Sequence, residues 1–488
     1  MNIISVFYDF TKIFNKKMSA NINPLNLEQK IIETGDDFTL KLYENYLSFL
    51  DHSFKYSSNR LEKYIVKETT LKTLTSSIGN ITFTSTRYID RETKKSYYPI
   101  RDILNLKAYQ RMTNEAEHTI TKYAMENNMS QAAKHAIRNT PISRSTVSKK
   151  IAKLNGSIKE DIQRSTNQPD VLYIEIDEVH ANLQHGGNQI CPCAIVHEGH
   201  KEDFVKRKEL KHVHYFASAK LSYEELAEVI YDYVDRKYDI YKFKRIFVSG
   251  DGLIASKNLN DIFPNSKFVF DPFHYRRKHL GYIFKNNKML INMADSYIKN
   301  NQIDEFNELV KIQIKDYPEQ ENKIREHAKC IIKNIEYIQN QNDELYKCPC
   351  SMEGHVNHGF ARYITSSPFG FSLNGLNNKL KLLVYKANKV DLTIEDYMNL
   401  KYGKDSYIEI NKNINKLLNV KIDKSLLSKK DIETNINIKM SFLSSGNNLF
   451  KTMKDLISID NNIKFIWFIL QLRTKASFVK YKILNNEI

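Results

Sequence analysis

The chain has 488 residues, of which 41% are hydrophobic, so it is too long for one small domain and can bury more than one core. Its longest apolar run, residues 465–470, is far shorter than the roughly 20 residues that a membrane-spanning helix needs. The opening residues lack a signal-peptide pattern, and we therefore expect a cytoplasmic, multi-domain protein with no membrane partner. A net charge of +16 favours a polyanionic partner, although part of this charge could be solvated surface lysine.

Residues 1–112 are predicted to form an N-terminal helical and β-hairpin region. An apolar stripe between Phe38 and Leu50, at mixed three- and four-residue spacing, indicates a helix within a helix-prone segment that extends to about residue 70. From residue 73 to residue 100 polar and apolar residues alternate, as they do in β-strands. Gly79 and Asn80 interrupt this alternation and suit a tight turn, so a β-hairpin is expected there.

Residues 113–168 are predicted to form a helix-turn-helix region that binds DNA. A helix at residues 130–137, a break at residues 139–141 and a second helix capped by Ser143 follow one another. Val147, Ile151 and Leu154 form the inner face of the second helix. Its outer face is small, polar and basic, as a helix entering the major groove needs, and consists of Arg144, Ser145, Ser148, Lys149 and Lys150. An ordinary pair of packed helices with a solvated outer face is the alternative.

Residues 169–285 are predicted to form the first part of a ribonuclease H-like core. The pattern indicates strands at residues 171–176, 190–197 and 212–218, a helix at 221–238, a strand at 245–249, a short helix and a strand at 267–270. Asp177, Asp251 and Asp271 come at the ends of the first, fourth and last of these strands, where an α/β sheet exposes a site. Gly250 and Gly252 flank Asp251 and allow backbone or substrate to approach closely.

The remaining segments complete an α/β protein. Residues 286–346 are charged and helical, and they are predicted to be an insertion in the core. Residues 347–400 are predicted to contain the final helix region of the core, in which Glu353 opens a helical segment at residues 353–362. Residues 401–488 are predicted to form a C-terminal helical tail.

The acidic residues at these positions suit metal-dependent phosphodiester cleavage. This reaction needs an activated water or hydroxyl in line with the leaving oxygen, and two magnesium ions held by a few convergent carboxylates stabilise both. Asp177 is placed to bridge the two ions, Asp251 to share one and Glu353 to hold the other, with Mn²⁺ as a substitute for Mg²⁺. A helix cap or a turn is the commoner role of one acidic residue at a strand end, and Glu344 is an alternative to Glu353.

The chain resembles the ISLre-type insertion-sequence transposases, a group also catalogued as an uncharacterised protein family, in five segments: residues 174–184, Ser249-Gly250-Asp251-Gly252, Asp271-Pro272-Phe273-His274, residues 353–358 and Ser366-Ser367-Pro368-Phe369-Gly370. The resemblance extends over roughly residues 70 to 400. The segment that runs from Asp271 to His274 is also similar to one in Mutator-like transposases, which belong to the same DDE class. Phe371 stands where this family leads us to expect Trp, a conservative aromatic change.

The resemblance implies that Asp177, Asp251 and Glu353 are the catalytic carboxylates, and that Asp271 and His274 are accessory residues of the active site. It implies a DDE transposase that binds the terminal inverted repeats of its element, frees 3′ hydroxyls by hydrolysis and joins them to target DNA. Such an enzyme is expected to act as a homodimer or larger oligomer on DNA, at the bacterial nucleoid. A domesticated or inactive DNA-binding protein and a ribonuclease H-like nuclease are the alternatives.

Two further groups of residues suggest ligands. Arg276, Arg277 and Lys278 follow His274 and are predicted to contact DNA phosphates, with a solvated charged face as the alternative. Histidines are dense around the first three strands, and two Cys-Pro-Cys pairs could in principle bind zinc: Cys191 with Cys193, and Cys348 with Cys350. A one-residue gap departs from the usual spacing of roughly two to four residues in zinc sites, so structural thiols are expected instead.

Overall fold

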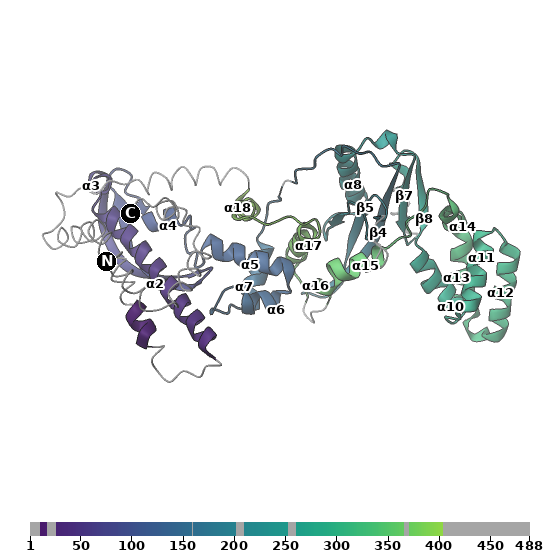
Figure 1. Ribbon diagram of the computed structural model, residues 1–488, viewed down its shortest axis with the longest axis horizontal. Coiled ribbons are helices and arrows are strands. Elements are labelled where there is room, and N and C mark those ends of the chain that lie inside the picture. The colour runs from purple at the N-terminus through teal and green to yellow at the C-terminus, as the bar shows by residue number, and fades with distance from the viewer. Residues whose placement is uncertain are drawn as a thin grey trace, which may run out of the picture. The chain divides into compact units, whose positions relative to one another are not determined.

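The computed structural model describes residues 10–16, 26–158, 160–201, 209–251, 260–365 and 370–403 (Figure 1). Among these residues, one compact unit is formed by the segments up to Leu74 and from Asn80 to Arg111, and a second by Thr75–Gly79 and the segments from Met112 onward. The chain is a mixed α/β protein with a three-stranded and a five-stranded sheet. None of the helices in the described part combines the length and apolar character that crossing a bilayer requires.

The first unit packs a long helix against a small antiparallel sheet. Helices α2 (Leu27–Lys55), α3 (Ser58–Lys63) and α4 (Pro99–Ile103) accompany strands β1 (Tyr64–Ser76), β2 (Gly79–Asp90) and β3 (Ser96–Tyr97). Leu47 of α2 shares a buried cluster with Phe83 of β2 and Ile100 of α4. The predicted β-hairpin is confirmed, but its turn lies two residues earlier than predicted, because β1 ends at Ser76 and Gly79 already begins β2.

The beginning of β1 corrects the sequence prediction. A helix-prone segment was expected up to about residue 70, whereas the chain is already a strand from Tyr64. Residues 64–70 include an aromatic residue and four β-branched residues, which favour extended backbone. The apolar stripe that suggested a helix ends well before this segment.

The second unit begins with three helices, α5 (Asn114–Glu126), α6 (Met129–His135) and α7 (Arg144–Ala152). The predicted two-helix pattern is confirmed, since the Ser143 side chain accepts a hydrogen bond from the backbone N–H of Thr146 and so caps α7. Val147 and Ile151 are fully buried, as the spacing predicted. The turn between α6 and α7 contains Asn139 with φ of 54°, a left-handed conformation that Asn tolerates.

Helix α17 (Leu373–Ala387) joins these helices to the larger sheet, and α18 (Ile394–Tyr402) packs beside α5. The side chain of Asn378 on α17 donates hydrogen bonds to the carbonyls of Ile151 and Leu154 at 2.9 and 2.8 Å. The adjacent Asn377 accepts a hydrogen bond from Ser218 at 3.0 Å, directly after the edge strand of the sheet. Two neighbouring asparagines thus hold α7 on one side and the sheet on the other.

The five-stranded sheet has the order β6-β5-β4-β7-β8, formed by β4 (Val171–Asn182), β5 (Asn188–His197), β6 (His214–Ala217), β7 (Arg245–Gly250) and β8 (Ser266–Phe270). The pairs β4–β5 and β5–β6 are antiparallel, whereas β4–β7 and β7–β8 are parallel. Helix α8 (Tyr223–Lys237) covers the face that carries Ile174 and Ile176. The opposite face carries Val179 and packs against the helices that follow residue 351.

Strand β4 is longer than predicted. It continues to Asn182, which pairs with Asn188, so Asp177 lies inside the strand and not at its end. The extension has a physical reason, because residues beyond Asp177 alternate in burial and pair with β5. Residues 252–259, which include Gly252 and most of the short helix expected between β7 and β8, lie outside the described residues.

The segment predicted to be an insertion, residues 286–346, is mainly helical. Helices α11 (Lys288–Lys299), α12 (Ile303–Asp316), α13 (Glu321–Lys333) and α14 (Ile335–Gln339) share their own buried cluster around Phe306 and lie beyond the β8 edge of the sheet (Figure 1). The insertion is preceded by a π-helical turn, η3 (His274–Leu280), and by α10 (Gly281–Ile283). The chain then continues through α15 (Met352–Val356), η6 (Asn357–Ala361) and α16 (Arg362–Ile364), which confirms the helical segment predicted at residues 353–362. Of the predicted tail, residues 404–488 lie outside the described residues.

Candidate active site

Three aspartates lie near one another on the parallel part of the sheet: Asp177 within β4, Asp251 directly after β7 and Asp271 directly after β8. Glu175 of β4 is in register with Ser249 of β7, so Asp177 and Asp251 come two residues further along neighbouring parallel strands. Gly250 of β7 is in register with Phe270 of β8, which places Asp271 directly after the next strand. Side chains at matching positions of parallel strands lie on the same face, and this arrangement gathers negative charge on that part of the sheet.

Glu353 reaches this part of the sheet from a distant segment of the chain. Ligand atoms of Asp177, Glu353 and His274 all lie within 4.8 Å of one another, and all three side chains are half-buried. Asp251 is near enough to raise the pKa of Asp177 electrostatically. Glu344, the alternative third carboxylate, is exposed and does not belong to this group.

A buried glutamate holds the helix that carries Glu353. Glu175 is 1% exposed, and its Oε2 accepts hydrogen bonds from the backbone N–H and the hydroxyl of Ser351 at 2.8 and 3.1 Å. Its Oε1 lies 3.0 Å from Nε2 of the fully buried His197. Ser351 precedes α15, and Glu353 follows two residues later. The amide of Asn357 then donates to Oε1 of Glu353 at 3.2 Å.

No function was predicted for Glu175 from the sequence, although a signal was present. Glu175 stands between two isoleucines in a strand whose neighbours are all buried, and a carboxylate in such a position requires hydrogen-bond partners. The identity of the partner could not be derived, because Ser351 is far away in sequence. Glu175 therefore ties β4, which carries Asp177, to the start of α15.

The electrostatics of the site fit a bound cation. The pKa of Asp177 is raised to about 6, mainly by burial and also by the neighbouring carboxylates of Glu353 and Asp251, while the backbone N–H of Glu178 and the ring of His274 oppose this rise. The Glu178 N–H donates to Oδ1 of Asp177 at 2.8 Å. Mg²⁺ and Mn²⁺ bind carboxylate oxygens, and a cation between these carboxylates would offset their mutual repulsion. The residues present thus fit a divalent metal ion.

His274 is held by Asp271 at the side of this group. Its Nδ1 lies 3.1 Å from Oδ2 of Asp271, and this interaction is the main cause that raises the pKa of His274. Asp271 is itself 3% exposed, and its Oδ1 accepts a hydrogen bond from the backbone N–H of Phe273 at 2.9 Å. Asp271 and His274, which the resemblance implied as accessory residues, therefore both lie at the candidate site.

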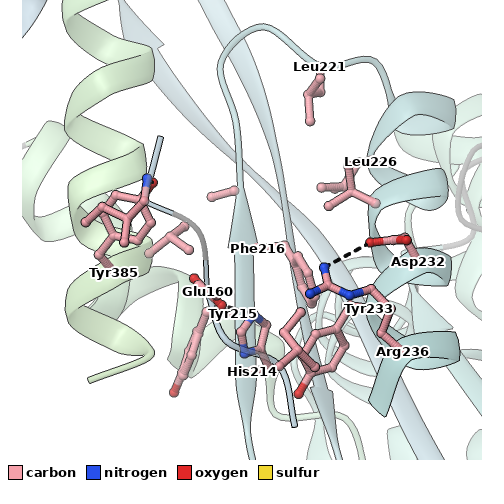
Figure 2. Close-up of a pocket in the computed structure, with 15 residues that line it drawn as sticks. Glu160, His214, Tyr215, Phe216, Leu221, Leu226, Asp232, Tyr233, Arg236 and Tyr385 are labelled. Carbon is pink, nitrogen blue, oxygen red and sulfur yellow. Dashed lines mark hydrogen bonds and ion pairs between the residues drawn. The ribbon is translucent and has the colours of Figure 1, made fainter. Parts of the chain in front are cut away.

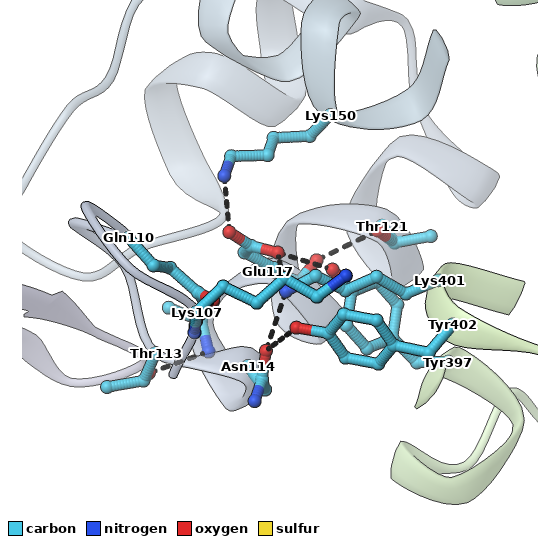
Figure 3. A network of polar contacts seen from close by, with 11 residues as sticks. Lys107, Gln110, Thr113, Asn114, Glu117, Thr121, Lys150, Tyr397, Lys401 and Tyr402 are labelled. Atoms are coloured by element: carbon cyan, nitrogen blue, oxygen red, sulfur yellow. Dashed lines mark hydrogen bonds and ion pairs between the residues drawn. The ribbon is translucent and has the colours of Figure 1, made fainter. Parts of the chain in front are cut away.

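The basic residues predicted on α7 differ in their surroundings. Ser145 and Lys149 are exposed, and Arg144 and Ser148 are half-buried. The ammonium of Lys150 pairs with the buried carboxylate of Glu117 on α5, which also binds Lys401 and Tyr397 of α18 (Figure 3). Burial opposes ionisation of Glu117, but Lys401 and Lys150 together hold its pKa below the usual value. Lys150 thus contributes to attaching α7 to the neighbouring helices.

The basic residues after His274 also differ from one another. Arg276 pairs with Asp295 of α11, and its Nη2 donates to Oδ1 of Asn292 at 2.6 Å. This arginine therefore connects η3 to the insertion. Arg277 and Lys278 are exposed, and the Arg277 guanidinium lies 5.1 Å from the ring centroid of Phe273. These two side chains remain the candidates for phosphate contacts.

The Cys-Pro-Cys pairs do not meet at a common site. Cys191 and Cys193 are buried in β5, whereas Cys348 lies 3.3 Å from Nε2 of His200. Among the described residues, the group of Asp177, His274 and Glu353 is the only set of at least three His, Cys, Asp or Glu side chains with spacing suited to a metal ion. Several of the histidines near the first strands pair with glutamates instead: His180 with Glu178, His197 with Glu175, His212 with Glu198 and His214 with Glu160.

A cavity of about 350 Å³ lies elsewhere in the second unit (Figure 2). It is lined by residues of β6, α8 and α17 and by Ile158, Glu160 and Ile162, with His214, Tyr215 and Tyr385 among the lining residues. None of the acidic residues of the candidate site lines it. The cavity is therefore separate from the group that fits a metal ion.

Residues 18–399 match an uncharacterised protein family, UPF0236. Similar proteins occur in Caldanaerobacter subterraneus subsp. tengcongensis, where three UPF0236 proteins are each 28% identical to the chain over 398 residues. The alignments cover 80% of this chain and 84%, 84% and 79% of the three relatives. The names of these relatives combine eleven, four and two locus designations, respectively.

Proposed function

The chain belongs to the UPF0236 family, and from this family and the site above we propose that it is a DDE-type DNA transposase of the ISLre type. In this proposal Asp177, Asp251 and Glu353 bind two divalent metal ions, Mg²⁺ or Mn²⁺, for hydrolysis and strand transfer. The observation that carries it is the meeting of ligand atoms of Asp177 and Glu353 within 4.8 Å, with Asp251 directly after the end of the adjacent parallel strand β7.

The sheet supports the ribonuclease H-like part of the proposal. Three antiparallel strands in the order β6-β5-β4 continue into two parallel strands, with Asp177 on the central strand β4 and Asp251 directly after its parallel neighbour β7. The sequence predicted the order of elements along the chain for a ribonuclease H-like core, and the five strands and α8 follow that order. A long helical insertion between β8 and the helix with Glu353 agrees with the same architecture.

The residues of the chain have distinct tasks in the proposed reaction. Divalent metal ions bound at the site supply Lewis-acid stabilisation of the scissile phosphate and lower the pKa of the attacking water or 3′ hydroxyl. Asp177 must be ionised to bind them, which its pKa of about 6 allows in neutral solution. The Glu178 N–H and the Asn357 amide fix one oxygen of Asp177 and one of Glu353, so that these oxygens are in place before substrate arrives.

The relatives support a mobile element as the source of the gene. The name of one relative combines eleven locus designations of a single organism. A protein encoded at many positions in one genome is what a DNA element that copies or moves itself would leave behind. We infer that this chain acts on DNA in the same way, at the bacterial nucleoid.

The helices α5 to α7 complete the proposal as the DNA-binding part. Helix α7 is capped, packed on its inner face and exposed at Ser145 and Lys149, which suits a helix in the major groove. Because strand transfer requires two element ends in one complex, we propose a homodimer or larger oligomer on DNA.

A cleavage and joining assay tests the proposal. Purified protein is incubated with Mg²⁺ or Mn²⁺ and labelled duplexes that contain the inverted repeats flanking its gene, together with a supercoiled target. We expect cut 3′ ends and joined products, and at least about 100-fold lower rates for Asp177→Asn, Asp251→Asn and Glu353→Gln. Glu344→Gln is the matched control and should behave like the unchanged protein. Cutting without joined products would favour a nuclease, and binding without cutting would favour a domesticated DNA-binding protein.

A further inference from the structure

We propose that His274 is a direct ligand of the metal ion that Asp177 and Glu353 hold, and that Asp271 fixes its ring for this purpose. The site would then combine carboxylate oxygens with one imidazole nitrogen and favour first-row transition ions over Mg²⁺. The inference deepens the proposed function, since it uses the same metal site, but it does not depend on transposition.

The first support is the geometry of the group. A ring nitrogen of His274 and one oxygen each of Asp177 and Glu353 lie within 4.8 Å of one another, as donors around one ion do. The three residues come from β4, η3 and α15, three elements of the second unit that are far apart in sequence. All three are half-buried, which leaves part of the coordination sphere open to substrate and water.

The second support is the contact between His274 and Asp271. Histidines that bind metal commonly donate their other ring N–H to a carboxylate, which fixes the tautomer and the ring orientation. Here Nδ1 of His274 lies 3.1 Å from Oδ2 of Asp271, close enough for this carboxylate to orient the ring although the angle is not that of a hydrogen bond, and in the proposal Nε2 is the nitrogen that binds the ion. Asp271 is fixed in turn, because its backbone N–H donates to the carbonyl of Gly250 at 2.8 Å and its Oδ1 accepts from Phe273.

A nitrogen ligand determines which metal ion the site binds more tightly. Mg²⁺ prefers oxygen donors and gives up water reluctantly, whereas transition ions bind imidazole readily. A site of three carboxylates alone would discriminate little between Mg²⁺ and Mn²⁺. With His274 as a ligand, the affinity for Mn²⁺ exceeds that for Mg²⁺, and removal of the ring lowers the Mn²⁺ affinity more than the Mg²⁺ affinity. The competing role for His274 is a phosphate contact that binds no metal.

Pulsed electron paramagnetic resonance of Mn²⁺ added to the metal-free full-length protein distinguishes these roles. We expect modulation from a directly bound ¹⁴N nucleus, replaced by the ¹⁵N pattern when the protein is labelled with ¹⁵N-histidine. This comparison needs no mutation, so it holds even if a variant fails to fold. A Mn²⁺ spectrum without nitrogen coupling would overturn the inference.

Variants then assign the nitrogen to a residue. His274→Gln should lose the coupling and weaken Mn²⁺ binding at least tenfold, while Asp271→Asn should keep the coupling and weaken binding by about 10- to 100-fold. His358→Gln is the matched control, since His358 is exposed on η6 near Glu353 and lies outside the group. Coupling that persists in His274→Gln would overturn the assignment.

The outcomes separate this inference from the proposed function. Nitrogen coupling in a protein that neither cuts nor joins DNA would support the ligand and contradict the transposase. Conversely, cutting and joining by a protein whose Mn²⁺ shows no nitrogen coupling would support the transposase and contradict the ligand.

Discussion

His214 shows how single residues of this protein are kept in one protonation state. Its ring stacks on Tyr233 with centroids 4.1 Å apart, and Nε2 accepts a hydrogen bond from the amide of Asn388 at 3.2 Å. Glu160 lies 3.2 Å from the same nitrogen (Figure 2). Burial lowers the pKa of His214 to about 3 and raises the pKa of Glu160. The fold therefore accepts a neutral imidazole and resists a charged one.

This residue predicts a pH dependence of stability. The pKa of His214 falls from 6.5 in the unfolded chain to about 3, so its contribution is fully present above pH 6.5 and is lost as the pH falls towards 3. We expect the free energy of unfolding of the natural protein to drop by about 2 kcal/mol relative to His214→Gln between about pH 7 and pH 5. Urea unfolding at several pH values measures this difference. For the control variant His358→Gln, the difference in unfolding free energy from the natural protein should not change with pH. Curves of unfolding free energy against pH that run parallel for the natural protein and His214→Gln would contradict the prediction.

At the scale of elements, the site depends on how α15 is attached to β4. Asp177 and Glu175 lie on the same face of β4, and Ser351 and Glu353 lie two residues apart at the start of α15. The hydrogen bonds between Glu175 and Ser351 join the two pairs directly. The separation of Asp177 and Glu353, the two carboxylates proposed to bind metal, is therefore set by a contact in which neither of them takes part.

Glu175→Gln tests this attachment. The amide oxygen of the variant can still accept one hydrogen bond from Ser351, but the second carboxylate oxygen is replaced by an NH₂ group. We therefore expect a loss of about 1–3 kcal/mol in stability and at least tenfold weaker Mn²⁺ binding. Calorimetric titration with Mn²⁺ and thermal unfolding measure the two effects. Glu178→Gln is the matched control, because Glu178 lies on the opposite face of β4, bound to Tyr223. Equal weakening in both variants would argue against a positioning role for Glu175.

Periodicity predicted much of the element order but not its details. The strands, α8, the insertion and the pair α6 and α7 follow from local spacing and capping, which are properties of short segments. The length of β4 did not follow, because its last five residues become a strand only by pairing with β5. The partners of Glu175, Lys150 and Arg276 did not follow either, since each lies on another element. The position of Glu353 was predicted only from the family resemblance. The hydrogen bonds between Glu175 and Ser351 give the physical reason why Glu353 lies near Asp177.

At the scale of the whole molecule, several of the lysines that contribute to the net charge of +16 are not available to a partner. Lys379 is fully buried, and its ammonium donates to the carbonyl of Asn127 at 2.9 Å. Burial lowers the pKa of Lys379 to about 7. Lys150 and Lys401 are directed to Glu117. These charges stabilise packing between helices and do not belong to a surface for DNA.

Two neighbouring lysines make this distinction measurable. Lys149→Ala should change the unfolding free energy by no more than about 0.5 kcal/mol, because the side chain is exposed. It should also lower the slope of log K for DNA binding against log salt concentration by an amount equal to about one released ion. Lys150→Ala should leave that salt dependence nearly unchanged and cost about 1–3 kcal/mol, since Glu117 loses one of its partners. Binding titrations at several salt concentrations and urea unfolding give both values. The reverse pattern would show that Lys150, and not Lys149, meets the phosphates.

The adjacent asparagines of α17 have a consequence for where DNA would be cut. Asn378 holds the end of α7, and Asn377 holds the residue after β6, so one rigid helix carries both attachments. For a protein that recognises DNA with α7 and breaks it at Asp177, this link fixes the interval between the recognised sequence and the broken bond. The cut would fall at a constant number of base pairs from the bound site, whatever sequence lies between, and the ends of successive copies of the element would be identical to the nucleotide.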